Sequence, residues 1–241
     1  MTSPIKNVVL VHGAWADGSS WSKVVPLLQA EGLNVVCTQN PLSSIADDVA
    51  VANRMINAQD GPVLLVGHSY GGVIITEAGN NPKVQGLVYV AAFAPDEGES
   101  IASFSQPFGA TPALGELRPI ADGFLLLSRK GILEDFAQDL SIEERETMVA
   151  TQGATQGAIL GTPAGSAAWH TKPSWFVIAS QDRTIAPEQH KFMAARIGAK
   201  TITLAASHVA MLAKPTEVAA FIAEAALSGV AEAPELVGAR A

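Results

Sequence analysis

The segment Gly67-His68-Ser69-Tyr70-Gly71-Gly72 lies between the apolar run 63–66 and the helical pattern of residues 73–78. The order strand, G-x-S-x-G, helix predicts a sharp turn that presents a serine at the N-terminus of a helix. A residue on so sharp a turn takes strained backbone angles, and its neighbours two positions away must lack a β-carbon to avoid clashes. Backbone N–H groups at the helix N-terminus favour negative charge nearby. We therefore expect Ser69 to be a catalytic nucleophile.

Short apolar runs alternate with amphipathic segments along the chain, which is typical of βαβ units and a parallel sheet. The runs are rich in Val, Ile and Leu and show little alternation, so we expect strands covered on both faces. The fold class is therefore α/β, with about six mostly parallel strands flanked by helices. The expected strands are 7–11, 34–38, 62–67, 85–92, 174–179 and 200–205, and the expected helices are about 20–31, 44–59, 70–80, 187–198 and 215–227.

The segment from about 95 to 170 breaks this rhythm, because it is dense in Gly, Pro, Ala and Thr and lacks a strong strand pattern. It contains one expected helix, 141–152, which Ser141 and Glu144 would open with a capping box. A long excursion between two sheet strands is more often a functional lid than a structureless loop. We expect a single domain over 1–241, with a small cap inserted after the fourth strand and a loose tail over about 228–241.

A serine hydroxyl is a poor nucleophile at neutral pH unless a base removes its proton. His208 follows the expected strand 200–205 and so lies at the carboxyl edge of the sheet, where functional groups collect in open α/β folds. We expect His208 to be that base.

The other four histidines have more ordinary expected roles. His68 should point away from its neighbour Ser69, and His12 should support its own loop. His190 lies in an expected surface helix, which favours a solvated position. His170, at the end of the cap, is expected to be structural, with lining of the pocket as the alternative.

An acid should orient the base and stabilise its charged form. Asp182 follows the expected strand 174–179 and gives the order Ser, Asp, His that this strand–turn–serine arrangement predicts. The rival is Asp96, which follows the expected strand 85–92 at an equivalent edge position. Asp182 is the favoured acid, with a plain turn aspartate as the alternative reading.

Backbone donors must also stabilise the oxyanion of a tetrahedral intermediate. The Tyr70 amide directly follows the serine, and a second donor should come from the loop after the first strand, where the Ala14 amide is favoured. The loss of one such donor typically costs about 2.7–4 kcal/mol of transition-state stabilisation.

Composition excludes several classes of protein. The formal net charge is -8 and no Lys/Arg cluster exceeds two adjacent residues, so we expect no nucleic acid or membrane partner. No apolar run reaches the roughly 18 residues of a membrane span. The single cysteine, Cys37, lies in an apolar run and cannot form an intrachain disulfide. These features predict a cytoplasmic protein, and without ligand spacing or a G-x-G-x-x-G pattern we expect no metal and no cofactor.

Four blocks of the sequence resemble the plant methylesterase and hydroxynitrile lyase branch of the α/β hydrolases, and the resemblance covers nearly the whole chain. It implies the α/β-hydrolase fold with a small mobile cap, and it supports Asp182, because Gln181-Asp182-Arg183 with Ile185 matches the acid block of the family. The blocks are Val11-His12-Gly13-Ala14-Trp15, Gly67-His68-Ser69-Tyr70-Gly71-Gly72, Ala91-Ala92-Phe93-Ala94-Pro95-Asp96 and Ser207-His208-Val209-Ala210-Met211-Leu212.

Within that branch, the lyases are similar in carrying a threonine in the oxyanion loop and a lysine after the catalytic histidine. Here those positions are Gly13 and Val209, so the resemblance implies an esterase. We expect Gly13, Trp15 and Val209 to border the substrate. The cap is rich in Phe and Leu, which favours an apolar acyl or alkyl group, although core packing explains these residues equally well.

The predicted function is hydrolysis of a small carboxylic ester through an acyl-enzyme on Ser69, with a small molecule as partner and a homodimer as a possible assembly. The alternatives are a lactonase, a thioesterase, a lyase-like enzyme, or a small-molecule sensor on the same fold. A sensor would differ from an enzyme by near-stoichiometric release of product from a simple ester.

Overall fold

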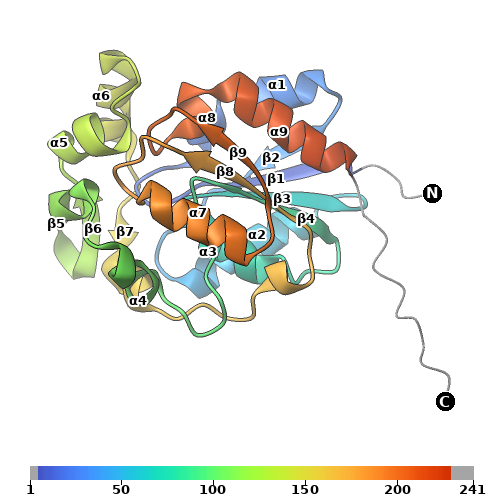
Figure 1. The fold of residues 1–241 in the computed structure, drawn as a ribbon, viewed down its shortest axis with the longest axis horizontal. Helices are drawn as coiled ribbons and strands as arrows, with labels where there is room; N and C mark the ends of the chain where they lie inside the picture. The colour runs from blue at the N-terminus through green and yellow to red at the C-terminus, as the bar shows by residue number, and fades with distance from the viewer. Residues whose placement is uncertain (1–4, 229–241) are drawn as a thin grey trace.

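The computed structural model describes residues 5–228, so residues 229–241 of the expected loose tail lie outside the described residues. A six-stranded sheet forms the centre of the molecule, in the order β2-β1-β3-β4-β8-β9, and every neighbouring pair is parallel (Figure 1). Each predicted strand is confirmed to within two residues at either end. The strands are β1 (Asn7–Val11), β2 (Asn34–Cys37), β3 (Val63–His68), β4 (Val84–Val90), β8 (Ser174–Ala179) and β9 (Lys200–Leu204).

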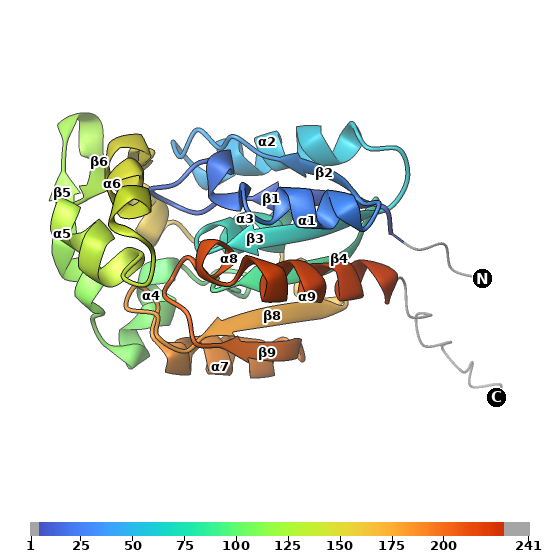
Figure 2. The same cartoon turned by 90° about the horizontal axis from the view of Figure 1, so that it is seen from above.

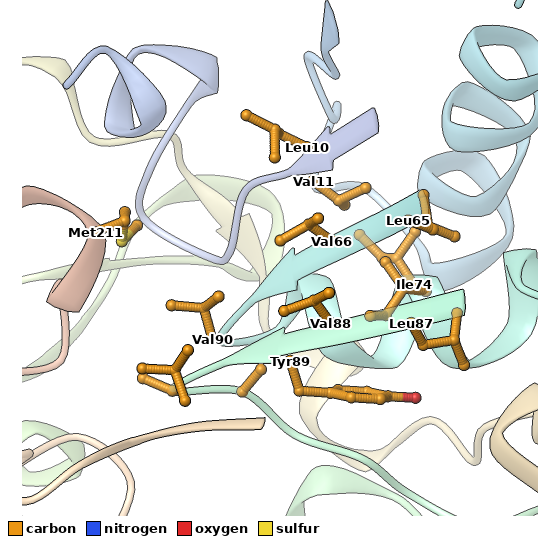
Figure 3. Close-up of a cluster of buried hydrophobic side chains, with 14 of the residues drawn as sticks. Leu10, Val11, Leu65, Val66, Ile74, Leu87, Val88, Tyr89, Val90 and Met211 are labelled. Carbon is orange, nitrogen blue, oxygen red and sulfur yellow. The ribbon is translucent and has the colours of Figure 1, made fainter. Parts of the chain in front are cut away.

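The core of the molecule lies on the four central strands, whose residues are almost all buried. Figure 3 shows how Val66 of β3 and Val88 of β4 pack together with Ile74, which comes from the helix that follows β3. The expectation that all six strands are covered on both faces is wrong for β2 and β9. These are the edge strands, which have a neighbouring strand on one side only among the described residues, and β9 exposes Lys200, Thr201 and Thr203.

Helices cover both faces of the sheet (Figures 1 and 2). One face carries α1 (Val25–Ala30), α8 (Ala210–Ala213) and α9 (Pro215–Leu227), and the other carries α2 (Ile45–Asn57), α3 (Gly71–Ala78) and α7 (Pro187–Arg196). A short 3-10 helix, η1 (Gly18–Trp21), precedes α1 where the sequence predicted one continuous helix over 20–31. The chain order and the parallel strands place the carboxyl ends of the strands at one edge.

The segment between β4 and β8 lies against that edge (Figure 2). Its helix α6 (Ile142–Thr151) is confirmed, with the predicted capping box between Ser141 and Glu144. The remaining helices are α4 (Ile101–Ser105), α5 (Arg129–Gly131), which continues into a π-helix (Ile132–Phe136), and 3-10 helices at Gln106–Phe108, Pro112–Glu116, Ala121–Gly123, Gly157–Gly161 and Ala168–His170.

This segment also contains a small antiparallel sheet, β5-β6-β7, which the sequence did not predict. Its strands are too short to show an alternating pattern, and β6 is apolar throughout, so periodicity cannot distinguish it from a piece of buried helix. The strands are β5 (Leu117–Pro119), β6 (Phe124–Leu127) and β7 (Thr155–Gln156).

Candidate active site

Ser69 stands on the sharp turn between β3 and α3. Its backbone has a φ of 53°, in the left-handed region that residues with a side chain rarely adopt. The turn is held by its neighbours, because the Ser69 amide donates to Val90 O (3.3 Å) and the Ser69 carbonyl accepts from the Phe93 amide (3.1 Å). Strain of this kind persists only where the surrounding structure determines it, and it is common at catalytic positions.

The two glycines that flank the serine are required by space. A β-carbon on Gly67 would lie 2.5 Å from the Gly71 carbonyl oxygen, and one on Gly71 would lie 2.6 Å from the Val11 carbonyl oxygen. The expectation that these positions must lack side chains therefore matches the packing of the turn.

His208 and Asp182 meet in a fully buried contact. His208 Nδ1 lies 2.6 Å from Asp182 Oδ2, and neither side chain is exposed. An ionised carboxylate only accepts hydrogen bonds, so Nδ1 carries the proton and the other ring nitrogen, Nε2, is left as an acceptor. Nε2 is buried and has no hydrogen-bond partner among the described residues.

The Asp182 carboxylate is held on its other oxygen as well. Oδ1 accepts from the amides of Thr184 (2.7 Å) and Ile185 (3.0 Å). Burial opposes ionisation of this carboxyl, but the imidazoles of His208 and His190 and the hydrogen bonds outweigh it and lower the pKa of Asp182. The group is therefore ionised at neutral pH.

His68 places His208 beside the turn. Its Nε2 donates to the His208 carbonyl (3.0 Å), and the two rings are 4.7 Å apart. Burial, followed by the neighbouring His208, holds the pKa of His68 well below its usual range. Phe136 of the π-helix packs against both rings, with its centroid 4.9 Å from that of His208 and 6.5 Å from that of His68. Ser69 Oγ and His208 Nε2 are not hydrogen-bonded, and such bonds in catalytic sites often tighten only when substrate binds.

The loop after β1 lies directly against the serine. A β-carbon on Gly13 would lie 2.7 Å from Ser69 Cβ and 3.2 Å from His68 Nδ1, so the backbone here approaches as closely as it can. The amides of Ala14 and Tyr70, the predicted oxyanion donors, form no hydrogen bond with any of the described residues. Both amides are therefore available to a ligand.

His12 stabilises this loop through hydrogen bonds. The Asn40 amide donates to His12 Nε2 (2.9 Å), so the proton is on Nδ1, which donates to Gly13 O (2.9 Å). Burial lowers the pKa of His12, which keeps the ring neutral. These contacts agree with the structural role expected for it.

Trp15 and Val209, two predicted substrate contacts, are both almost fully buried. Trp15 has a φ of 55°, and its amide and indole Nε1 donate to Thr155 Oγ1 and Leu125 O, both at 3.2 Å. The indole thus ties the loop after β1 to the small sheet β5-β6-β7. It also borders a cavity of about 370 Å³ between η1 and α6.

Asp96, the rival acid, does not approach His208. It lies at the surface, where its Oδ1 pairs with His170 Nε2 at 2.8 Å. The pair links the segment after β4 to the end of the cap. This contact gives Asp96 and His170 a structural role outside the site.

His190 is the residue that the sequence placed wrongly. It was expected on a solvated face of α7, but it is fully buried, and its Nε2 lies 3.4 Å from Asp182 Oδ2. The charged and polar residues around it hide this position. The signal that reveals it is the spacing i, i+3, i+4, which places His190 on one helix face with the buried Met193 and Ala194.

A second cavity, of about 400 Å³, is lined by residues that contact the site, although Ser69 and His208 themselves do not line it. It reaches Phe93, whose amide bonds to the Ser69 carbonyl, and Thr184, whose amide bonds to Asp182. Most of its lining is apolar. The lining residues are Phe93, Ile101, Ala102, Ser105, Gln106, Gly109, Ala110, Thr111, Leu114, Leu160, Thr184 and Gln189.

No group of three or more His, Cys, Asp or Glu residues within 5–228 is arranged to hold a metal ion. None of the helices described over the same residues is both long and apolar enough to cross a membrane.

The profile of the alpha/beta hydrolase family matches residues 8–221 of the chain. A carbendazim hydrolyzing esterase of Nocardioides sp. (strain SG-4G) is 35% identical over 39% of this chain, and the match spans 45% of that protein, less than half of its length. Methylesterase 8 of Arabidopsis thaliana is 30% identical over 78% of this chain and 76% of its own length. The crystal structure of a pyrethroid hydrolase from Sphingobium faniae JZ-2 shares the fold, with a TM-score of 0.79 at 23% identity over 92% of this chain and 97% of that one.

Proposed function

The chain belongs to the alpha/beta hydrolase family, and from this premise we propose that it is a serine esterase that cleaves small carboxylic esters. One observation carries the proposal. The buried His208–Asp182 pair lies beside the strained turn of Ser69, with Nε2 of His208 free to accept a proton. Two of the relatives, the carbendazim hydrolyzing esterase and Methylesterase 8, have names that denote ester hydrolysis, which supports the same reaction here.

In the proposed first half-reaction, Ser69 Oγ attacks the ester carbonyl carbon while His208 Nε2 takes the hydroxyl proton. The carbonyl oxygen becomes an oxyanion that the amides of Ala14 and Tyr70 stabilise. The tetrahedral intermediate then expels the alcohol, which receives the proton from His208, and an acyl-enzyme on Ser69 remains.

In the second half-reaction, water attacks the acyl-enzyme while His208 again takes a proton. The same two amides hold the oxyanion, and collapse of the intermediate returns the proton to Ser69 Oγ and releases the acid. Asp182 stays ionised throughout, because its role is to hold the imidazole in the Nδ1–H tautomer and to stabilise the imidazolium that forms.

The apolar cavity beside Phe93 supports an apolar acyl or alkyl group as the part of the substrate that binds there. A volume of about 400 Å³ suits a small ester. Among the alternatives, the lyase is disfavoured by Val209. This residue follows the proposed base, is buried and apolar, and offers no cation to stabilise a departing anion such as cyanide.

The proposal is tested by steady-state hydrolysis of p-nitrophenyl acetate, butyrate and octanoate by the wild type and by Ser69→Ala. We expect multiple turnovers in the wild type and a loss of about 10⁴ to 10⁶ in kcat in the variant, because a catalytic triad acts as a unit. The order of the rates with chain length then measures the acyl group that the cavity accepts. A single burst without turnover would favour the sensor, and activity untouched by Ser69→Ala would contradict the mechanism.

A further inference from the structure

Two imidazoles, not one, face the carboxylate of Asp182. His208 Nδ1 approaches Oδ2 to 2.6 Å from one side, and His190 Nε2 approaches the same oxygen to 3.4 Å from α7. All three side chains are fully buried. Neither ring nitrogen of His190 has a hydrogen-bond partner among the described residues. A buried polar group without a partner is rare in proteins and calls for an explanation.

The charge state and tautomer of His190 follow from its surroundings. Burial lowers the pKa of His190 to about 4, so the ring is neutral at physiological pH. A neutral imidazole presents either an N–H or a lone pair at each nitrogen. A lone pair at Nε2 would be repelled by the anionic oxygen of Asp182, whereas an N–H is attracted to it. The Nε2–H tautomer is therefore the one that the geometry favours.

We propose that His190 is a positioning residue, whose Nε2–H faces Asp182 Oδ2 across 3.4 Å and withdraws charge from the oxygen that accepts the hydrogen bond of His208. The proposal rests on the esterase function proposed above. A carboxylate that shares its charge with a second donor stabilises the His208 imidazolium less strongly. Loss of the His190 N–H should therefore move the acidic limb of the kcat/KM profile to higher pH.

Few other charges can produce this effect. The charged or titratable groups around the two imidazoles come from four places: Asp182 and Arg183 from the loop after β8, His68 from β3, Glu188 from α7, and Asp135 and Asp139 from the cap. Asp135 and Asp139 are already engaged, by Arg183 Nε at 2.7 Å and by the Ser207 amide at 2.7 Å.

The alternative is that His190 only fills space. Its ring packs on Phe176, with centroids 5.8 Å apart, and any side chain of similar volume would serve that purpose. A packing role affects the free energy of unfolding but leaves the pH dependence of the reaction unchanged. The two roles are therefore separable by experiment.

The test is the pH profile of kcat/KM for p-nitrophenyl butyrate with the wild type, His190→Gln and His190→Leu. Glutamine keeps an N–H donor at similar reach, and leucine removes it while keeping the volume. We expect the midpoint of the acidic limb to rise by about 0.5 pH unit or more in His190→Leu and to stay near the wild-type value in His190→Gln. The same midpoint in all three proteins, with only a lower Tm for His190→Leu, would overturn the proposal.

A second measurement needs neither activity nor a variant. In wild-type protein labelled with ¹⁵N-histidine, NMR reports the tautomer of each ring from the shifts of its two nitrogens. We expect His190 to be neutral with the proton on Nε2 from pH 6 to 8, and a proton on Nδ1 would overturn the proposal even if His190→Leu failed to fold. Failure of the esterase proposal is distinct, since it would appear as absent turnover in the wild type whatever the tautomer.

Discussion

His208 Nδ1 donates to Asp182 Oδ2 over 2.6 Å, in a contact whose two side chains are fully buried. The acceptor is fixed in turn, because the amides of Thr184 and Ile185 hold its second oxygen. The orientation of the imidazole is thus set before any substrate arrives. Preorganisation of this kind is where the catalytic advantage of a buried acid–base pair comes from.

Asp182→Asn should lower kcat by about 10⁴ while leaving the fold intact. An amide offers its NH₂ as well as its oxygen, so the imidazole loses the carboxylate that fixes its tautomer and stabilises its charge. The measurement is hydrolysis of p-nitrophenyl butyrate, with Asp96→Asn as the matched control. Because Asp96 pairs with His170 at the surface, its variant should keep wild-type kcat. Equal losses in the two variants would contradict the assignment of the acid.

Gly13→Ala should impair both folding and activity. The new β-carbon would lie 2.7 Å from Ser69 Cβ, a distance that forces the loop or the serine turn to move. Overpacking of this kind costs about 1–3 kcal/mol of unfolding free energy, and displacement of the Ala14 amide should lower kcat as well. Urea denaturation and kcat give the two readouts. Gly115→Ala is the control, because nothing lies within 4 Å of its added atom. Equal unfolding free energies and equal kcat values in the two variants would contradict the geometry.

Tyr70→Phe should lower the free energy of unfolding by about 1–3 kcal/mol, because it leaves a buried carboxylate partly unpaired. The Tyr70 hydroxyl donates to Asp48 Oδ2 (2.7 Å), whose other oxygen accepts from the Leu42 amide (2.9 Å). Burial already raises the pKa of Asp48, so loss of a donor raises the cost further. Denaturant titration measures the change. Ser43→Ala, which loses an exposed hydrogen bond, should change stability by less than about 0.5 kcal/mol. A tyrosine variant as stable as this control would show that Asp48 finds other partners.

Lys23→Met should weaken the attachment of the cap in a pH-dependent way. Lys23 Nζ lies 2.5 Å from Glu144 Oε1 on α6, and this contact, with help from Ser141, lowers the pKa of Glu144 from 4.5 to about 2. A lowered carboxyl pKa means that the stabilisation is fully present above pH 4.5 and is lost as the pH falls towards 2. Because both groups are partly exposed, the expected loss at pH 6 is below about 1 kcal/mol.

The check is urea denaturation of the wild type and Lys23→Met at pH 6 and pH 3, with Lys191→Met as a control whose lysine is exposed and forms no ion pair with the described residues. The difference caused by Lys23→Met should shrink at pH 3. A difference that is constant with pH would mean that the alkyl chain of Lys23, or its hydrogen bond to the Leu212 carbonyl (3.1 Å), stabilises the protein, and that its pairing with Glu144 does not.

The parts of this molecule that could be predicted from sequence are those in which one residue type has one physical explanation. Gly67 and Gly71 permit the turn, the apolar runs form buried strands, and His208 and Asp182 follow strands at the edge where the site forms. His190 was misplaced because charged and polar neighbours obscured the spacing that it shares with Met193 and Ala194, the face of α7 that packs against β8. The sheet β5-β6-β7 was not predicted for a related reason. Its strands are so short, as in the pairing of Phe124 with Gln156 and Leu125 with Thr155, that they show no detectable periodicity.

The partners of Tyr70 show a further limit of the sequence. Asp48 lies in α2, far from the serine turn in sequence, and it meets the Tyr70 hydroxyl only because α2 packs beside α3. Its surroundings in the sequence are those of an ordinary polar helix face. Long-range contacts between two polar side chains carry no local signal, and they required the structure.

The central claim, that Ser69 is the nucleophile, is tested most directly by covalent labelling with a fluorophosphonate. Attack of an activated serine on phosphorus expels fluoride and leaves a phosphonyl group on Oγ, which peptide mass spectrometry locates. We predict one adduct per chain, on the peptide that contains Ser69. Ser69→Ala should form no adduct, and Asp182→Asn should form it at a much reduced rate. An adduct on another residue would contradict the account. So would wild-type ester turnover that persists after Ser69 has been fully labelled.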